Sequence, residues 1–142
     1  MPVPQNWFGA SAEAILGNIW LANPMKVALM KPSYVPNRDT QKVFADIAAQ
    51  ELAAAGGYVA GGITLVGKTA DYDAASDTTH LFATDVVWGP GVTFDTAFAV
   101  VYDNSGGKPL WGLIDFQGTK SVGNGVFQLD FDSLGLLDIV AV

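Results

Sequence analysis

Alternating side chains in the second half of the chain constrain its fold more than any other feature. Between residues 94 and 103, one face carries Phe94, Thr96, Phe98, Val100 and Tyr102. This two-residue period predicts a strand that is half-buried at its start and covered on both faces later, where the intervening residues are also apolar. Strand-like segments recur downstream at intervals of about a dozen residues, which is typical of a sandwich or barrel. We therefore predict a mainly β fold, a single-domain β-sandwich or jelly-roll.

Turn residues divide this sheet into its expected strands. Gly89-Pro90-Gly91 predicts the end of one strand, and the glycine-rich residues 117–125 predict a loop. Residues 104–107 predict the turn of a hairpin. Gly67 predicts a bend inside a strand. The expected strands are residues 25–30, 63–72, 81–88, 94–103, 110–116, 126–131 and 136–142.

Two segments have helical character. The clearer one covers residues 40–54, where Asp39 or Thr40 can cap and apolar residues recur near the 3.6-residue period. A shorter helix is expected from Ser11 to Leu16, with Gly17-Asn18 as its stop. The two prolines before Trp7 predict an extended arm over residues 1–10, followed by one β-rich domain over residues 11–142.

Charge and composition restrict the function. The chain has 14 Asp and Glu, 7 Lys and Arg and a net charge of −7, so binding of bare nucleic acid is not expected. Only 15% of the residues are charged, against about 25% in ordinary domains, which predicts a largely neutral surface suited to protein contacts. There is no cysteine, no secretory leader and no apolar run long enough for a membrane helix. We expect a soluble chain without membrane contact.

Residues 62–69, Gly-Ile-Thr-Leu-Val-Gly-Lys-Thr, formally match a phosphate-binding loop. Such a loop follows a buried strand and opens a helix, whereas here an alanine-rich segment precedes it and Ala70-Asp71-Tyr72 follows. The variable positions are apolar or β-branched, so we expect a strand whose amides bond to a sheet. Nucleotide binding through this motif is the least favoured function.

Acidic residues suggest a second possible site. Asp71, Asp73 and Asp77 cluster, as do Asp130 and Asp132, so calcium binding is conceivable, although ordinary turn and strand-edge roles are favoured. Neither cluster has the pattern of an EF-hand. His80 stands alone and is expected at a strand edge. The chain has two glutamates, Glu13 and Glu51, both on predicted helices, with Glu51 on a solvated face; we expect no cofactor and no catalytic residue.

Aromatic residues outside the alternating core pattern are candidates for a contact surface. Trp7 and Phe8 can anchor the arm, and the apolar C-terminus can fill a groove on a neighbour. The candidate interface residues are Trp7, Phe8, Trp20, Trp88, Trp111, Val140 and Val142.

An ordered set of short segments gives the chain a family resemblance. The segments are residues 25–30, 34–37, 44–47, 57–62, 65–69, 85–88, 99–103, 109–116 and 127–131. Read in order, they resemble a family of small structural proteins of tailed bacteriophages, over roughly Trp7 to Ile139. The resemblance implies a virion component of the head surface or tail, without catalytic residues. The proline-rich arm and the tail 138–142 depart from the family pattern.

The resemblance and the physical features together predict a non-enzymatic virion protein. We expect a capsid decoration protein that binds the major capsid protein or other virion proteins and forms a homo-oligomer, for which a trimer is one arrangement. An acidic subunit is repelled from the genome and attracted to a basic patch. The alternative is a tail- or fibre-associated jelly-roll that binds a sugar or receptor, marked by exposed Trp and Tyr beside Asp or Asn in one concavity.

Overall fold

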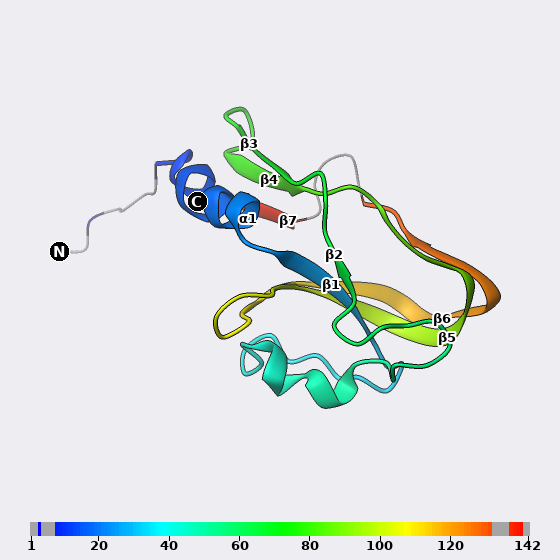
Figure 1. The fold of residues 1–142 in the computed structure, drawn as a ribbon. Helices are drawn as coiled ribbons and strands as arrows, with labels where there is room; N and C mark the ends of the chain where they lie inside the picture. Colours follow the sequence, from blue (N-terminus) through cyan, green and yellow to red (C-terminus); the bar gives the residue numbers. More distant parts are fainter. Residues whose placement is uncertain (1–2, 4–7, 132–136, 141–142) are drawn as a thin grey trace. The chain divides into compact units, whose positions relative to one another are not determined.

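The computed structural model describes residues 3, 8–131 and 137–140, which form a mainly β protein (Figure 1). These residues contain two antiparallel sheets, so the predicted mainly β fold is confirmed. The chain divides into two compact units, each considered by itself. One unit combines residues 1–23, 66–84 and 131–142, and the other combines residues 24–65 and 85–130.

The larger unit, residues 24–65 and 85–130, contains a four-stranded sheet. Its strands lie in the order β2 (Ile63–Thr64), β1 (Met25–Met30), β5 (Val86–Asp103) and β6 (Leu110–Leu129). Five of the six residues of β1 are buried, because a strand covered on both faces needs a continuous apolar run. β5 becomes buried on both faces after Asp95, as the alternating sequence predicted.

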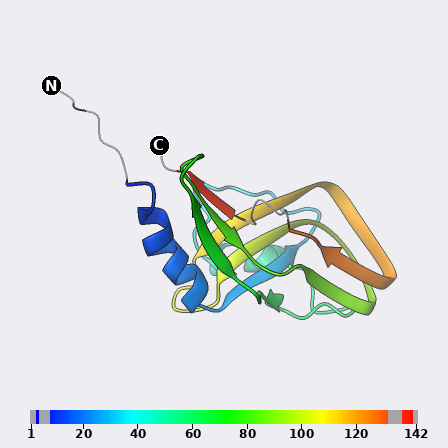
Figure 2. The same cartoon turned by 90° about the horizontal axis from the view of Figure 1, so that it is seen from above.

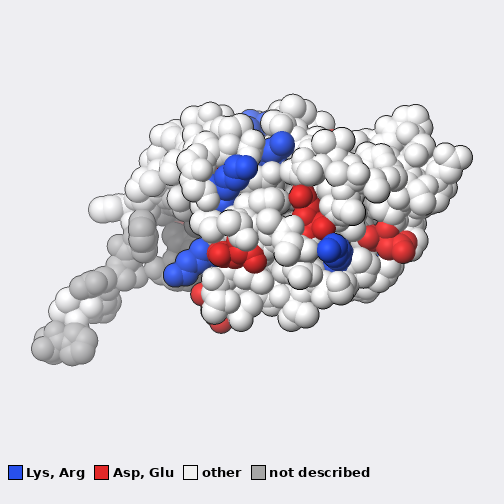
Figure 3. Space-filling view, turned by 60° about the horizontal axis from the view of Figure 1, so that its bottom comes forward, with Lys and Arg blue, Asp and Glu red and all other residues white. Residues whose placement is uncertain are grey.

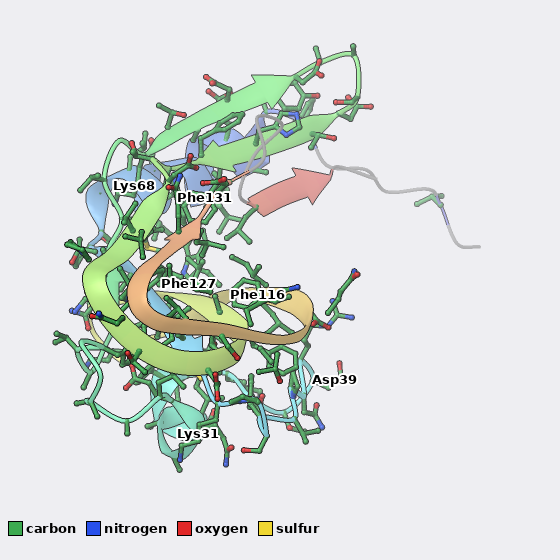
Figure 4. All side chains as sticks on the ribbon, turned by 90° about the vertical axis from the view of Figure 1, so that its right-hand side faces the viewer. Lys31, Asp39, Lys68, Phe116, Phe127 and Phe131 are labelled. Atoms are coloured by element: carbon green, nitrogen blue, oxygen red, sulfur yellow. The ribbon has the colours of Figure 1, made fainter. Side chains whose placement is uncertain are left out.

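The β5/β6 hairpin is much longer than predicted. The expected stop at 89–91 and the expected loop at 117–125 are both wrong, since β5 and β6 continue through them and curl together (Figure 4). Gly89 (φ 115°), Gly91 (φ 84°) and Gly118 (φ 132°) adopt backbone angles that favour glycine. The pairing register shifts at four points along the hairpin. The turn-forming residues therefore bulge and bend this ribbon without ending its strands.

The predicted helix over residues 40–54 is wrong. Two short 3₁₀ turns stand there, η2 (Phe44–Asp46) and η3 (Ala48–Gln50). Both ends of the segment bond to the sheet: Leu110 N donates to Lys42 O (2.9 Å), and Leu52 N donates to Leu29 O (3.0 Å). Because a helix would need these backbone groups for its own i to i−4 bonds, only single turns fit between them.

The apolar spacing that suggested a helix reflects burial. Ile47 is completely buried. The ring of Phe44 packs on that of Tyr102, with 4.4 Å between centroids and a 31° angle between planes. Both residues join a core built from β1, β5, β6 and the connecting segments. Its members are Ala28, Met30, Tyr34, Ile47, Val100 and Tyr102, with Phe44, Phe98, Leu110 and Leu113 packed against them.

The smaller unit contains a three-stranded antiparallel sheet, in the order β3 (Thr69–Asp73), β4 (Thr78–Phe82) and β7 (Leu137–Val140). The strand predicted over residues 136–142 corresponds to β7 within the described residues. Gly67 (φ 63°) lies between β2 and β3, where a bend inside a single strand was predicted. The strand predicted over residues 81–88 is divided, because β4 ends at Phe82 and β5 begins at Val86.

An N-terminal helical segment runs alongside β3 and β4 in the smaller unit (Figure 2). It comprises the π-helical turn η1 (Glu13–Gly17) and α1 (Asn18–Ala22), so the predicted stop at Gly17-Asn18 is wrong. Gly17 is buried, and a Cβ there would lie 3.0 Å from the Cβ of Ala70. The glycine thus lets the helix approach β3 closely. Trp20 is fully buried, and its Nε1 donates to Phe82 O (3.1 Å).

We predict that Gly62→Ala lowers the free energy of unfolding by about 3–5 kcal/mol. Gly62 has a φ of +80°, and a Cβ there would lie 1.9 Å from Val27 O. Gly106→Ala is the matched control, because its φ is +54° but nothing lies within 4 Å of the added Cβ. The control should lose only about 1–2 kcal/mol, the strain of a left-handed residue. Equal losses in urea unfolding would contradict the close approach of Gly62 to β1.

Candidate functional site

The motif at residues 62–69 lies in strands and a turn. Ile63 pairs with Val27 in β1, and Thr69 begins β3. The ammonium of Lys68 donates to Asn23 O. The segment leads into a strand where a phosphate-binding loop would open a helix. The single strand predicted over residues 63–72 is wrong, because residues 65–68 separate β2 from β3 and the two strands belong to different sheets.

The acidic residues of the β3–β4 turn bind groups of their own turn. Asp73 accepts hydrogen bonds from Ala75 N (2.9 Å) and Ser76 Oγ (3.0 Å), and Asp77 accepts one from Tyr72 OH (2.8 Å). The Ala75 amide, followed by the Ser76 hydroxyl, lowers the pKa of Asp73. Over residues 3, 8–131 and 137–140, no group of three or more His, Asp or Glu is placed to hold a metal. Asp132 lies outside the described residues.

His80, Glu13 and Asp130 are further polar residues that the sequence singled out. His80 lies in the middle of β4, opposite Asp71 of β3 and Asp138 of β7, so the strand-edge prediction is wrong. Its ring centroid is 6.1 Å from that of Phe82. Glu13 is helical as predicted, at the start of η1. The carboxylate of Asp130 accepts a hydrogen bond from the side-chain amide of Gln128.

The candidate interface residues do not form one surface. Trp20 (0% exposed) and Trp88 (4%) are core residues, so their prediction as contact residues is wrong. Phe8 is 88% exposed, as a contact residue requires. Val140 is the last residue of β7, opposite Thr78. Trp7, Val142 and the side chain of Val140 lie outside the described part of the structure.

Trp111 is partly buried in the wall of a groove in the larger unit. The groove encloses about 170 Å³ between the loop that follows β1 and the adjacent parts of β5 and β6. The loop contributes Tyr34, Asn37, Arg38 and Gln41 to its lining. An aromatic side chain, a cation and two amides therefore meet in one concavity.

Hydrogen bonds shape the loop side of this groove. Tyr34 OH donates to Gln41 Oε1 (2.7 Å), which also accepts from Asn37 N (3.0 Å). Asn37 Oδ1 accepts from Asp39 N (3.0 Å) and Thr40 N (3.2 Å). Burial raises the pKa of Tyr34, which keeps its hydroxyl a donor. These bonds fix the loop and use the oxygen, not the NH₂ group, of each side-chain amide.

Asn37, Arg38 and Gln41 were not predicted as site residues from the sequence. Pro36-Asn37 ahead of Asp39 has the composition of an Asx turn, which is the available local signal. No pattern in the chain places this turn beside Trp111, because that contact depends on how β1 and β6 are arranged in the sheet.

A partly buried network around Glu51 was also not predicted from the sequence. The prediction of a solvated helix face is wrong, since Glu51 Oε2 accepts hydrogen bonds from Tyr58 OH (2.8 Å) and Gly61 N (2.8 Å). Tyr58 OH accepts from Leu29 N (3.1 Å), and Tyr102 OH donates to Gly61 O (2.7 Å). Burial, then the bond to Glu51, raises the pKa of Tyr58. Burial, then the charge of Glu51, raises the pKa of Tyr102 to about 12. The network attaches residues 51–61 to the sheet.

Comparisons of the chain with family models, curated proteins and solved structures find no match. Within the described ranges, every helix is too short or too polar to cross a membrane.

We predict that stability falls as pH rises from about 10 to about 12, and that Tyr102→Phe reduces this fall. An unfolded tyrosine loses its proton near pH 10, whereas folded Tyr102 keeps it until about pH 12. In this range the unfolded chain binds fewer protons, so rising pH favours unfolding. Urea-unfolding free energies of both proteins between pH 8 and 12 test this. A difference between the two proteins that stays constant with pH would contradict it.

Proposed function

We propose that this chain is a non-enzymatic structural protein of a bacteriophage virion, specifically a capsid decoration protein that binds the lattice of the major capsid protein. The ordered segment resemblance and the net charge of −7 support this proposal. An acidic subunit is repelled from the packaged genome and can be steered to a basic patch on a shell. The chain would reach the virion after assembly in the host cytoplasm.

Exposed apolar residues near the N-terminus carry the proposal. Phe8 is 88% exposed, Ile15 56% and Ile19 38%. Ile15 and Ile19 are four residues apart in the helical segment, so their side chains lie on the same side. Exposed apolar residues that gather on one face mark protein interaction sites. We assign Phe8, Ile15 and Ile19 as the apolar contact face for the capsid lattice or a second copy.

The free edge of β6 offers a second means of assembly. Beyond Leu110, no other strand of the described chain pairs with the outer edge of β6. Its residues 111–129 contain only two charges, Asp115 and Lys120, where exposed edges are commonly protected by several. Large parts of the visible surface are uncharged (Figure 3). A neighbouring subunit could add a strand here.

Electron microscopy of particles purified from the source of this chain tests the proposed function. We expect density for the chain at regular positions on the head surface, in contact with the major capsid protein. Absence of the chain from purified particles contradicts a virion role, and density confined to the tail or fibres contradicts decoration.

We predict that Ile15→Asp combined with Ile19→Asp weakens binding to heads stripped of the chain at least tenfold. Aspartates at a contact that becomes buried lose the apolar burial of the isoleucines, and their carboxylates must also be desolvated. A loss of about 1.4 kcal/mol in binding free energy corresponds to a tenfold loss of affinity. The matched control is Val59→Asp with Val66→Asp, two valines that are 70% and 62% exposed. All variants should fold, because the substituted side chains are exposed. Equal binding by the contact and control variants, measured by cosedimentation, would rule out the apolar contact face.

The groove at Trp111 favours a second candidate function, a tail- or fibre-associated module that binds a sugar or receptor. Trp111 and Asn37 lie together in one concavity, whereas Tyr34 in its lining is buried, so only part of the arrangement expected for such a module is present. We do not propose nucleotide binding, because residues 63–64 and 69 lie in strands.

A further inference from the structure

The two amides of the groove offer hydrogen-bond donors and no free acceptor. Gln41 Oε1 and Asn37 Oδ1 each accept two hydrogen bonds from the loop, which occupies both lone pairs of each oxygen. Gln41 Nε2 and Asn37 Nδ2 bond to nothing within the described ranges. A ligand meeting these two side chains must therefore supply acceptor oxygens.

Arg38 adds a positive charge to the same lining. Its side chain is exposed and forms no ion pair with any described residue, in a chain with twice as many acidic as basic residues. The neighbouring Asp39, labelled in Figure 4, is also exposed, and it forms no ion pair with Arg38 within the described ranges. A guanidinium presents a planar set of donors that matches a carboxylate. The groove is thus complementary to a negatively charged group.

Other residues of the lining are apolar, and the space is small. Trp111, Leu113 and Val100 line it together with Pro36. The volume of about 170 Å³ is below the roughly 300–1,000 Å³ of pockets for drug-sized ligands. One ring with a short polar substituent fits these dimensions, and an aromatic wall suits the less polar face of such a ring.

We propose that this groove binds a single acidic sugar residue, with its carboxylate on Arg38, Asn37 and Gln41 and its ring against Trp111. A monocarboxylate is favoured over a phosphate, because repulsion from a net charge of −7 grows with the charge of the ligand. Ring hydroxyls supply further acceptors for the two NH₂ groups. The inference deepens the second candidate function and rests on it only for its biological setting.

Titration of the full chain with D-glucuronate, followed by amide and indole NMR signals, tests this assignment. D-glucose and acetate serve as comparison ligands, lacking the carboxylate and the ring respectively. We expect saturable binding of glucuronate with a Kd of about 1 mM, as for a small ligand with few contacts, and weaker binding at high salt. Signals of Arg38, Gln41 and Trp111 should shift, with glucose and acetate at least tenfold weaker.

Two nearly isosteric substitutions isolate the donor groups. Gln41→Glu and Asn37→Asp keep the acceptor oxygens used by Tyr34 OH and by the Asx turn, so the loop should retain its shape. Each replaces an NH₂ donor with negative charge, and each should weaken glucuronate binding at least tenfold. Arg38→Ala should do the same. Lys120→Ala, nine residues along β6 from Trp111, removes the same charge and should bind like wild type.

The outcomes are separable. Loss of glucuronate binding in the Gln41, Asn37 and Arg38 variants, with retention in Lys120→Ala, supports the proposal. Equal binding of glucose overturns the acidic class, equal binding of acetate overturns the sugar ring, and an equal loss in Lys120→Ala shows unspecific attraction. Absence of saturable binding overturns the site altogether. If the chain binds glucuronate but microscopy places it on the head, the binding site is supported and the tail or fibre location is contradicted.

Discussion

The larger unit depends on the buried strand β1. It pairs with β2 on one side and along its whole length with β5 on the other, so its six residues are at the centre of the sheet. Three further polar contacts from distant segments end on its carbonyl groups, and all lie at 2.8–3.0 Å. They are Leu52 N to Leu29 O, Leu65 N to Met25 O and Thr96 Oγ1 to Met30 O. In a buried strand these groups have no water to bond, which obliges the surrounding chain to supply the donors.

The groove and the Glu51 network follow from this arrangement. The loop of residues 34–41 follows β1, and Trp111 lies on β6, so the sheet brings the two together. Residues 51–61 are also attached to β1, because Leu29 N donates a hydrogen bond to Tyr58 OH. Partly buried polar side chains of this unit, such as Gln41 and Glu51, thus hold the backbone of its loops in place through hydrogen bonds.

Sequence reasoning succeeded where a pattern reports local geometry. The alternation in residues 94–103 and the apolar run 25–30 both predicted what is observed. It failed where distant hydrogen bonds decide the outcome. Residues 40–54 have a helical period, yet their backbone groups bond to β1 and to Leu110. Trp20 and Trp88 were predicted at a contact surface, but both are buried. Their burial depends on packing against distant segments, which the neighbouring residues in the sequence do not reveal. The groove residues gave no signal beyond a turn.

At the bulges of the curled hairpin, β5 and β6 contribute unequal numbers of residues between neighbouring paired positions. Thr96 pairs with Lys120 and Phe98 with Asp115, so Ala97 alone lies across from residues 116–119 of β6. Val92 pairs with Gly125 and Phe94 with Val122, so Thr93 alone lies across from Gly123 and Asn124. The surplus on β6 is odd at both places, three residues and one residue, so each place reverses the inward and outward alternation of its side chains. Phe116 and Phe127 lie on either side of the Gly123-Asn124 insertion, and their ring centroids are 5.9 Å apart. In a related chain, loss of one residue at either place would therefore move the side chains beyond it to the other face of the ribbon, whereas loss of two residues would leave their side unchanged.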